Sequence, residues 1–524
     1  KLNVITNNII GLNQTGTQPI ANQNDGVLIL GGANSNIIGF SLDVDGNPIS
    51  GTSNLISGNN SSGIRVSTDA SSPETSDLNI VSGNRVGVSF DESIALANAG
   101  SGITITDSPQ NIVGNSDILP ANIVSGNAQN GILIEGAGAF ENLVISNHVG
   151  ITTEGNALAN GLAGLLVSGA PGTVLTNNNV GGNLADGIVA ENLALSFSPE
   201  RKTRTLPAGN DKISKYIRNA FANRGGGSYS LEISGNRIGV FGETNVPNAN
   251  NGIKFNNVQN ALIGGVAPTA GNMIRNNGGA GVRLDETNGN ENLINHNSIL
   301  GNTGLGIDLG TIGNTPNDIG DADEGANRGQ NFPEIVSKQI VNDELIINFK
   351  IESAPVNSNY GAQGLYVEFF KSDNSGEGER FLGFTHYIVA DYNGGFAGTK
   401  TVNLGNINVL GINQNDPITA TATDADGNTS EFFSPFAPSA AEVSVSGQII
   451  APNGTVISRA TIILTDDGGQ TRSVNSNAFG YFKFENVEVG RTYIISVRHK
   501  QYVFTQRVLT VNDEISELIL SAEQ

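Results

Sequence analysis

The sequence has no cysteine, and this absence excludes several kinds of chemistry. Without thiols the chain can form no disulfide, zinc–thiolate site or iron–sulfur cluster, and it has no thiol nucleophile. Histidine is scarce too, and none of the four belongs to a short metal-ligand spacing. We interpret them as unrelated core or surface side chains: His148, His296, His386 and His499.

Long apolar runs and an excess of basic residues are also absent. No run approaches the roughly 18 residues of a membrane span, and the polar N-terminal segment lacks a signal-peptide core. The chain is therefore expected to be either intracellular or extracellular with its signal peptide removed. With 27 basic against 49 acidic residues, the net charge is −22, so nucleic acid and anionic membranes are excluded as partners.

Glycine and asparagine are abundant instead, with 68 glycines and about 70 asparagines. Both residues tolerate left-handed backbone angles, glycine because it has no Cβ and asparagine because it bonds its own backbone. This composition predicts a fold that turns a corner every few residues.

A repeat built on such corners runs through the first part of the chain. Nine Gly-apolar-x-apolar strings begin at Gly26, Gly63, Gly102, Gly131, Gly164, Gly187, Gly252, Gly281 and Gly306. Asparagine-rich strings lie between them, and most starts are roughly 23 to 39 residues apart. Three short strands and three corners per repeat predict a β-solenoid of about ten coils with parallel strands. Sandwich hairpins are the alternative, but they would not need the same corner at every turn.

One segment carries a family resemblance. Residues 261–277, followed by Gly281-Val-Arg-Leu, closely resemble bacterial right-handed parallel β-helix repeat proteins, whose architecture is shared with pectin lyases. The resemblance covers roughly residues 1–330. It implies the fold but little about function, because this architecture carries lyases, hydrolases, tailspikes and adhesins.

Longer alternating strands follow from Asn331 and predict a β-sandwich over residues 331–436. Residues 418–432 resemble the Ig-like domain that commonly follows this β-helix. Residues 437–524 look like a carboxypeptidase-regulatory, transthyretin-like sandwich, a resemblance that implies a stalk or spacer. The predicted fold is therefore all-β: a right-handed parallel β-helix over 1–330, then two β-sandwich domains.

A basic insertion at 196–228 interrupts the repeat, and its residues 211–223 have the apolar spacing of a helix. One interpretation is a helix packed on the side of the rod with solvated charges. The other is a contact with an acidic partner, including a second copy of this chain. The contact residues would be Arg201, Lys202, Arg204, Lys212, Lys215 and Arg218.

Acidic stretches offer oxygen ligands of the kind that calcium prefers, although each is also typical of a turn. The strongest set lies at the end of the predicted β-helix: Asp318, Asp321, Asp323 and Asn327. Two weaker sets are Asp424, Asp426, Asn428 and Glu431, and Asp43, Asp45 and Asn47. Calcium is the one cofactor that the sequence predicts.

Enzymatic activity would need a catalytic cluster on one sheet. Aligning the glycine-led strings predicts one outward row: Leu28, Arg65, Thr104, Leu133, Leu166, Val189, Lys254, Arg283 and Asp308. The only charged group that this alignment brings together is Lys254, Arg283, Asp285 and Asp308, with Arg283 next to Asp308. We interpret the group as a ladder of ion pairs; a glycan subsite or catalytic cluster is the alternative.

The sequence thus favours a non-enzymatic structural or adhesive protein, extracellular or at the cell surface. Its expected partners are further copies of itself, other surface proteins or polysaccharide, because open solenoid ends expose strand edges and invite fibres or a surface layer. The alternatives are a polysaccharide lyase or hydrolase, or a glycan-binding adhesin that uses the β-helix face.

Overall fold

A computed structural model gives the structure of the chain. It describes residues 3–43, 45, 49, 51–69, 71, 74–114, 120–193, 229–265, 267–285, 289–373, 375–432, 442–465, 471–488, 491–511 and 514–523. The chain divides into two compact units, Lys1–Pro435 and Phe436–Gln524. Each unit is described by itself below.

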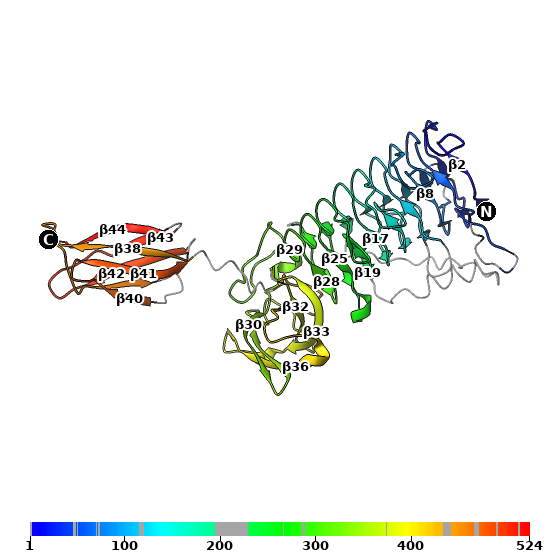
Figure 1. Ribbon diagram of the computed structural model, residues 1–524. Helices are drawn as coiled ribbons and strands as arrows, with labels where there is room; N and C mark the ends of the chain where they lie inside the picture. Colours follow the sequence, from blue (N-terminus) through cyan, green and yellow to red (C-terminus); the bar gives the residue numbers. More distant parts are fainter. Residues whose placement is uncertain are drawn as a thin grey trace. The chain divides into compact units, whose positions relative to one another are not determined.

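Three parallel sheets of nine strands form a β-helix in the first unit (Figure 1). The first sheet contains β1 (Val4–Ile5), β4 (Ile37–Ile38), β7 (Ile80–Val81), β10 (Ile112–Gly114), β13 (Leu143–Ile145), β16 (Thr173–Thr176), β19 (Leu231–Ser234), β24 (Ala261–Gly264) and β27 (Leu293–Asn295). The second contains β2 (Ile9–Ile10), β5 (Leu55–Ile56), β8 (Arg85–Val86), β11 (Ile123–Val124), β14 (His148–Val149), β17 (Asn179–Val180), β20 (Arg237–Ile238), β25 (Met273–Arg275) and β28 (Ser298–Leu300). The third contains β3 (Val27–Ile29), β6 (Ile64–Ser67), β9 (Ile103–Thr106), β12 (Ile132–Glu135), β15 (Leu165–Ser168), β18 (Ile188–Leu193), β23 (Ile253–Val258), β26 (Val282–Leu284) and β29 (Ile307–Leu309).

The predicted parallel β-helix is confirmed, and each of the nine glycine-led strings forms a strand of the third sheet. In β12, for example, Ile132 and Ile134 are buried while Leu133 and Glu135 are partly exposed. The inward residues of all coils join one continuous aliphatic core. Short elements outside the three sheets are the hairpin of β21 (Val240–Phe241) and β22 (Thr244–Asn245) and the 3₁₀ turns η1 (Pro268–Ala270) and η2 (Ala326–Gly329).

The glycines serve two different purposes. Gly126, in a Ser-Gly-Asn corner, has a φ of +71°, the left-handed conformation that the composition predicted. Gly63, which leads β6, is needed for space instead, because a Cβ there would lie 2.5 Å from Val86 Cγ1 and 2.7 Å from the Gly102 carbonyl oxygen. Adjacent coils therefore pack closely only where a side chain is missing.

Asparagine side chains form hydrogen-bonded rows along the corners, each Nδ2 donating to Oδ1 of the next coil over 2.7–3.0 Å. One row is Asn8, Asn54, Asn84, Asn122, Asn147, Asn178, Asn236, Asn272 and Asn297. Another is Asn22, Asn59, Asn98, Asn127, Asn160, Asn183, Asn248, Asn277 and Asn302. Since buried amides are costly unless satisfied, these rows fix the register of the coils.

A first sandwich follows the β-helix within the same unit. One sheet pairs β30 (Glu334–Val341), β31 (Glu344–Lys350) and β36 (Lys400–Asn406), and the other pairs β33 (Gly378–Tyr387), β32 (Leu365–Ser372) and β37 (Ile418–Thr423). Short elements between them are η3 (Val389–Asp391), β34 (Tyr392–Asn393), β35 (Phe396–Ala397) and α2 (Ile407–Leu410). Its core includes Phe349, Phe369 and Tyr387. In Figure 1 this sandwich lies against the last coils of the β-helix.

The second unit is a sandwich with its own core, which includes Ile462, Phe482 and Phe484. One sheet has the order β41 (Tyr481–Glu488), β38 (Glu442–Ile450) and β44 (Ile515–Ser521). The other has β40 (Thr471–Asn475), β39 (Thr461–Thr465), β42 (Arg491–Arg498) and β43 (Arg507–Val511).

Some predictions fall outside the described residues. These are the helix at 211–223, all six basic contact residues of the insertion, and Asn47. In the part of the chain that the structure describes, no helix has the length and apolar character needed to cross a membrane.

Candidate functional sites on the β-helix and at its capped end

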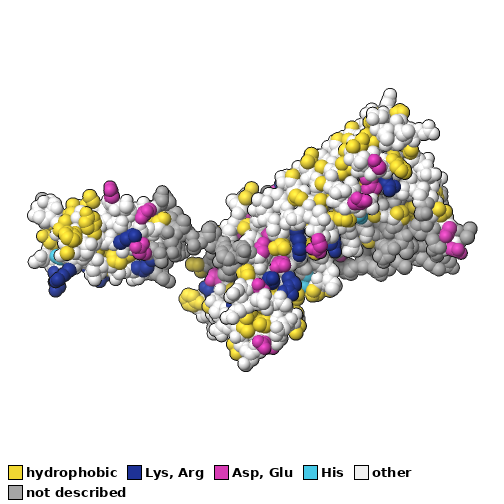
Figure 2. Space-filling model, in the orientation of Figure 1, with side chains coloured by type: hydrophobic (Ala, Val, Ile, Leu, Met, Phe, Trp, Pro, Cys, Tyr) yellow, Lys and Arg dark blue, Asp and Glu magenta, His cyan; other side chains and the backbone are white. Residues whose placement is uncertain are grey.

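The outward row of the third sheet has the predicted register, so Lys254 pairs with Arg283 and Arg283 with Asp308. Arg283 Nη1 lies 2.7 Å from Asp308 Oδ1, and Asp285 lies 3.2 Å from Arg283 Nε and 3.4 Å from Lys254 Nζ. Figure 2 shows basic and acidic side chains intermingled over the last coils of the β-helix. The predicted ladder of ion pairs is therefore present.

Burial decides the electrostatics of this ladder. Arg283 and Asp308 are only 7% and 4% exposed. Burial raises the pKa of Asp308, while the neighbouring Arg283 opposes this rise. Arg283 also donates to the Gly310 carbonyl oxygen. Both members of the buried pair are thus held by protein groups rather than presented to a substrate.

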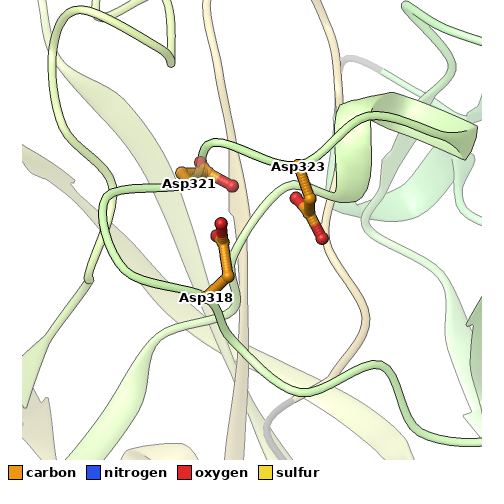
Figure 3. A group of neighbouring side chains, drawn as sticks. All are labelled: Asp318, Asp321 and Asp323. Carbon is orange, nitrogen blue, oxygen red and sulfur yellow. The ribbon is translucent and has the colours of Figure 1, made fainter.

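Asp318, Asp321 and Asp323 converge from one loop after the β-helix, with a ligand oxygen of each within 4.8 Å of the others (Figure 3). Burial, followed by the charges of Asp318 and Asp321, raises the pKa of Asp323 to about 6. Burial also raises the pKa of Asp321, whose oxygens accept from Gln330 and the Asn331 amide. Because a bound cation would offset this repulsion, the three carboxylates fit a hard cation such as calcium.

The fourth residue of this predicted set lies elsewhere. Asn327 Oδ1 accepts from the Asn292 backbone amide, and Asn327 Nδ2 donates to the carbonyl oxygens of Asn292 and Thr429. These three bonds occupy the Asn327 side chain at the end of the β-helix, so it does not join the carboxylates.

The weaker sets do not converge on one point either. Asp424 closes a turn by accepting from Asn428 and from the Asp426 amide, whereas Glu431 binds the last coil of the β-helix. Asp43 and Asp45 belong to no group of three acidic or histidine side chains close enough for a metal among the described residues.

No pattern in the sequence predicted the contacts between the first sandwich and the last coil. Glu377 accepts from the Asn302 backbone amide at 3.1 Å and from Asn302 Nδ2 at 3.0 Å, which ends one asparagine row. Glu431 accepts from the amides of Leu309 and Thr315, each at 3.0 Å. The sandwich thus supplies the acceptors that a tenth coil would have provided.

Glu368 completes this set of capping glutamates, defined as Glu368, Glu377 and Glu431. It accepts from the His296 amide at 3.1 Å, and its Oε1 lies 3.2 Å from His296 Nε2. Burial raises the pKa of all three to about 7 and lowers the pKa of His296. No periodicity marks these glutamates in the sequence; the only signal is an acidic residue beside aromatic ones, as at Glu368 and Phe369.

Aromatic side chains close the same end. Phe370 and Phe432 of the first sandwich belong to the β-helix core and are 2% and 8% exposed. Phe432 packs so closely on Gly306 that a Cβ there would lie 2.9 Å from its ring. The expectation of open solenoid ends is therefore corrected at this end, where the first sandwich covers the last coil.

Comparisons with known proteins identify the last domain. Residues 444–518 match the model of the carboxypeptidase regulatory-like domain, as the sequence predicted. A comparison with curated proteins found no match.

Three solved structures resemble parts of the chain. A double mutant of the periplasmic alginate epimerase AlgG is 12% identical over 54% of this chain, with a TM-score of 0.26, and the chain spans about 60% of its length. BcpA, the major pilin subunit of Bacillus cereus, is 12% identical over 36% of this chain and 70% of its own, with a TM-score of 0.15. A bacterial adhesin from Mobiluncus mulieris is 7% identical over 37% and 96%, with a TM-score of 0.14. Likenesses this low carry no argument about function.

Proposed function

We propose that this chain is a non-enzymatic structural and adhesive protein of the cell surface or extracellular space. The β-helix serves as a rigid rod that presents binding surfaces to polysaccharide, to other surface proteins or to further copies of the chain.

One observation carries this proposal: every ionisable side chain in the outward row of the third sheet is held in an ion pair. Arg65 pairs with Asp25 at 3.1 Å, and Lys254, Arg283 and Asp308 belong to the ladder described above. The other five positions of the row are leucine, valine or threonine. A hydrolase or lyase needs carboxyl or basic groups free to exchange protons with a substrate, and this row offers none.

The construction of the rod supports a mechanical role. The coils share a continuous core and hydrogen-bonded asparagine rows, and the first sandwich caps the last coil. These contacts restrain the coils from sliding or separating. Rigidity of this kind is suited to a spacer or a display surface.

The test combines imaging with a cleavage screen. The purified chain is examined by negative-stain electron microscopy with calcium and with chelator, and incubated with neutral and acidic polysaccharides. We expect association or polysaccharide binding without new reducing ends or unsaturated products. Turnover of any polysaccharide would overturn the proposal.

The alternative enzyme is tested by the same screen. A catalytic role for Lys254, Arg283, Asp285 and Asp308 would require turnover that Asp285→Asn abolishes. Asp285 is the informative position because its side chain is 34% exposed, so its replacement disturbs the core least.

A further inference from the structure

A pocket of about 470 Å³ lies where the last coils of the β-helix meet the first sandwich. We call it the junction pocket. Tyr229, Glu291 and Asn295 line it from the β-helix side, and Tyr366, His386 and Asp426 line it from the sandwich. Its size is that of a site for a small ligand or one to two sugar units.

Aromatic rings are concentrated in this pocket. The chain has only nine tyrosines and no tryptophan, yet Tyr229, Tyr360 and Tyr366 all line the pocket together with His386. The rings of Tyr366 and His386 lie 5.6 Å apart, and Tyr366 also contacts Phe384 at 5.1 Å. Tyr360 is only 4% exposed and donates its hydroxyl to the Ser353 carbonyl oxygen, so Tyr229 and Tyr366 are the tyrosines whose rings can meet a ligand. Such rings offer an apolar face to the C–H groups of a sugar and a negative face to a cation.

The charges in the wall have one sign. Glu291, Asp424 and Asp426 line the pocket, and no lysine or arginine is among its described lining residues. Burial, with the charges of Asp426 and Asp424, raises the pKa of Glu291 although Arg328 nearby opposes the rise. The three carboxylates therefore repel one another, and a positive ligand would relieve this repulsion.

Amide groups supply neutral hydrogen-bonding partners. Gln363 and Asn295 both line the pocket, and Asn295 Oδ1 is buried without a hydrogen-bond partner. Asn295 as a whole is 8% exposed. That oxygen is buried beside Gly264, which does not line the pocket, so Gln363, which is exposed, is the amide that a ligand can reach.

We propose that the junction pocket binds an amino sugar with a free ammonium group, the ammonium facing the carboxylates and the pyranose ring packing on the tyrosines. This inference rests on the proposed adhesive function and deepens it, because it names the chemistry of the polysaccharide. Uronates and phosphorylated sugars are excluded by like-charge repulsion, and an N-acetylated sugar lacks the cation.

Calorimetric titration of the intact chain tests the proposal with three probes: tetramers of glucosamine, of N-acetylglucosamine and of galacturonate. We expect binding of the glucosamine tetramer only, weakening as salt is raised. The double variant Glu291→Gln/Asp426→Asn should bind it at least tenfold more weakly. Glu485→Gln, on an exposed residue of the second unit, is the matched control and should bind like the wild type.

Each other outcome has one meaning. Equal binding of the acetylated tetramer, or full binding by the double variant, would overturn the assignment of the ammonium group. No binding of any tetramer would overturn the pocket as a sugar site while leaving the proposed function to the cleavage screen. Polysaccharide turnover, by contrast, would overturn the proposed function whether or not the pocket binds glucosamine.

Discussion

The two sandwiches of this chain use the same class of fold in different ways. The first places Phe370 and Phe432 in the core of the β-helix and its capping glutamates on the last coil. The second closes its core on its own residues, among them Ile462 and Phe482, and forms a separate compact unit. A sandwich therefore becomes a cap or an independent module according to a few side chains that contact the last coil, not according to its architecture.

The difference also shows what a β-helix needs at its end. The last coil leaves backbone amides and amide side chains without the next coil, and an apolar core without a cover. The capping glutamates accept hydrogen bonds from these amides, and the two phenylalanines cover the apolar core. This combination explains why residues 331–432 belong to the same compact unit as the β-helix.

The largest effect should come from breaking the shared core. Phe432→Ala would leave a cavity between the β-helix and the first sandwich and should destabilise the first unit by about 3–5 kcal/mol. Differential scanning calorimetry should show the transition of the second unit unchanged. Phe482→Ala is the matched control and should lower only the second unit's transition; if both variants shift both transitions, the two sandwiches do not differ as described.

Replacing an asparagine of a buried row should destabilise the protein less than Phe432→Ala does. It should still cost more than replacing an asparagine in an exposed turn. Asn127 is 2% exposed, donates to Asn160 and accepts from Asn98, so Asn127→Ala should cost about 2 kcal/mol. Asn453 only closes an exposed turn with Thr455, and Asn453→Ala should cost about 0.5 kcal/mol or less. Urea unfolding of both variants measures the difference, and equal costs would contradict a special role for the rows.

The pH dependence of stability should differ between the units. A pKa of about 7 for the capping glutamates is above their value in the unfolded chain, so the folded state binds more protons between about pH 4.5 and 7. The first unit should therefore lose stability as pH rises through this window. His148 and His296 act in the opposite sense because burial lowers their pKa, so they offset part of this loss.

Thermal unfolding at pH 5 and pH 7.5 measures this change. The capping glutamates, His148 and His296 all belong to the first unit, so the transition of the second unit should move less. Glu377→Gln should reduce the pH dependence of the first unit. A first unit that gains stability from pH 5 to pH 7.5 would show that the glutamates are not buried as described.

Calcium should have the smallest effect. If Asp318, Asp321 and Asp323 bind the ion as predicted, calcium at ten times its dissociation constant should stabilise the first unit by about 1.4 kcal/mol and leave the second unit unchanged. Asp323→Asn should remove the effect. An identical melting curve with calcium and with chelator would refute the prediction.

Much of the difference between the two sandwiches could not be predicted from the sequence. The glycine-led strings located every strand of the third sheet and the pairing of Arg283 with Asp308. The glutamates and phenylalanines of the cap carry no such signal, because they occur once each and their partners are about 70 to 120 residues away. The prediction that Asn327 joins the carboxylates was wrong for the same reason: its spacing suits a loop ligand, but its side chain bonds Asn292 and Thr429.

The sequence by itself determined the repeating part of the molecule. Each coil repeats the same inward Ile, Leu or Val, the same corner and the same asparagine. The repeat pattern alone is therefore enough to predict the β-helix. Only the tertiary structure decided how the repeat ends, which carboxylates are paired and where the aromatic rings meet. Those outcomes depend on single contacts between segments far apart in the chain, and burial sets the charge of the groups involved.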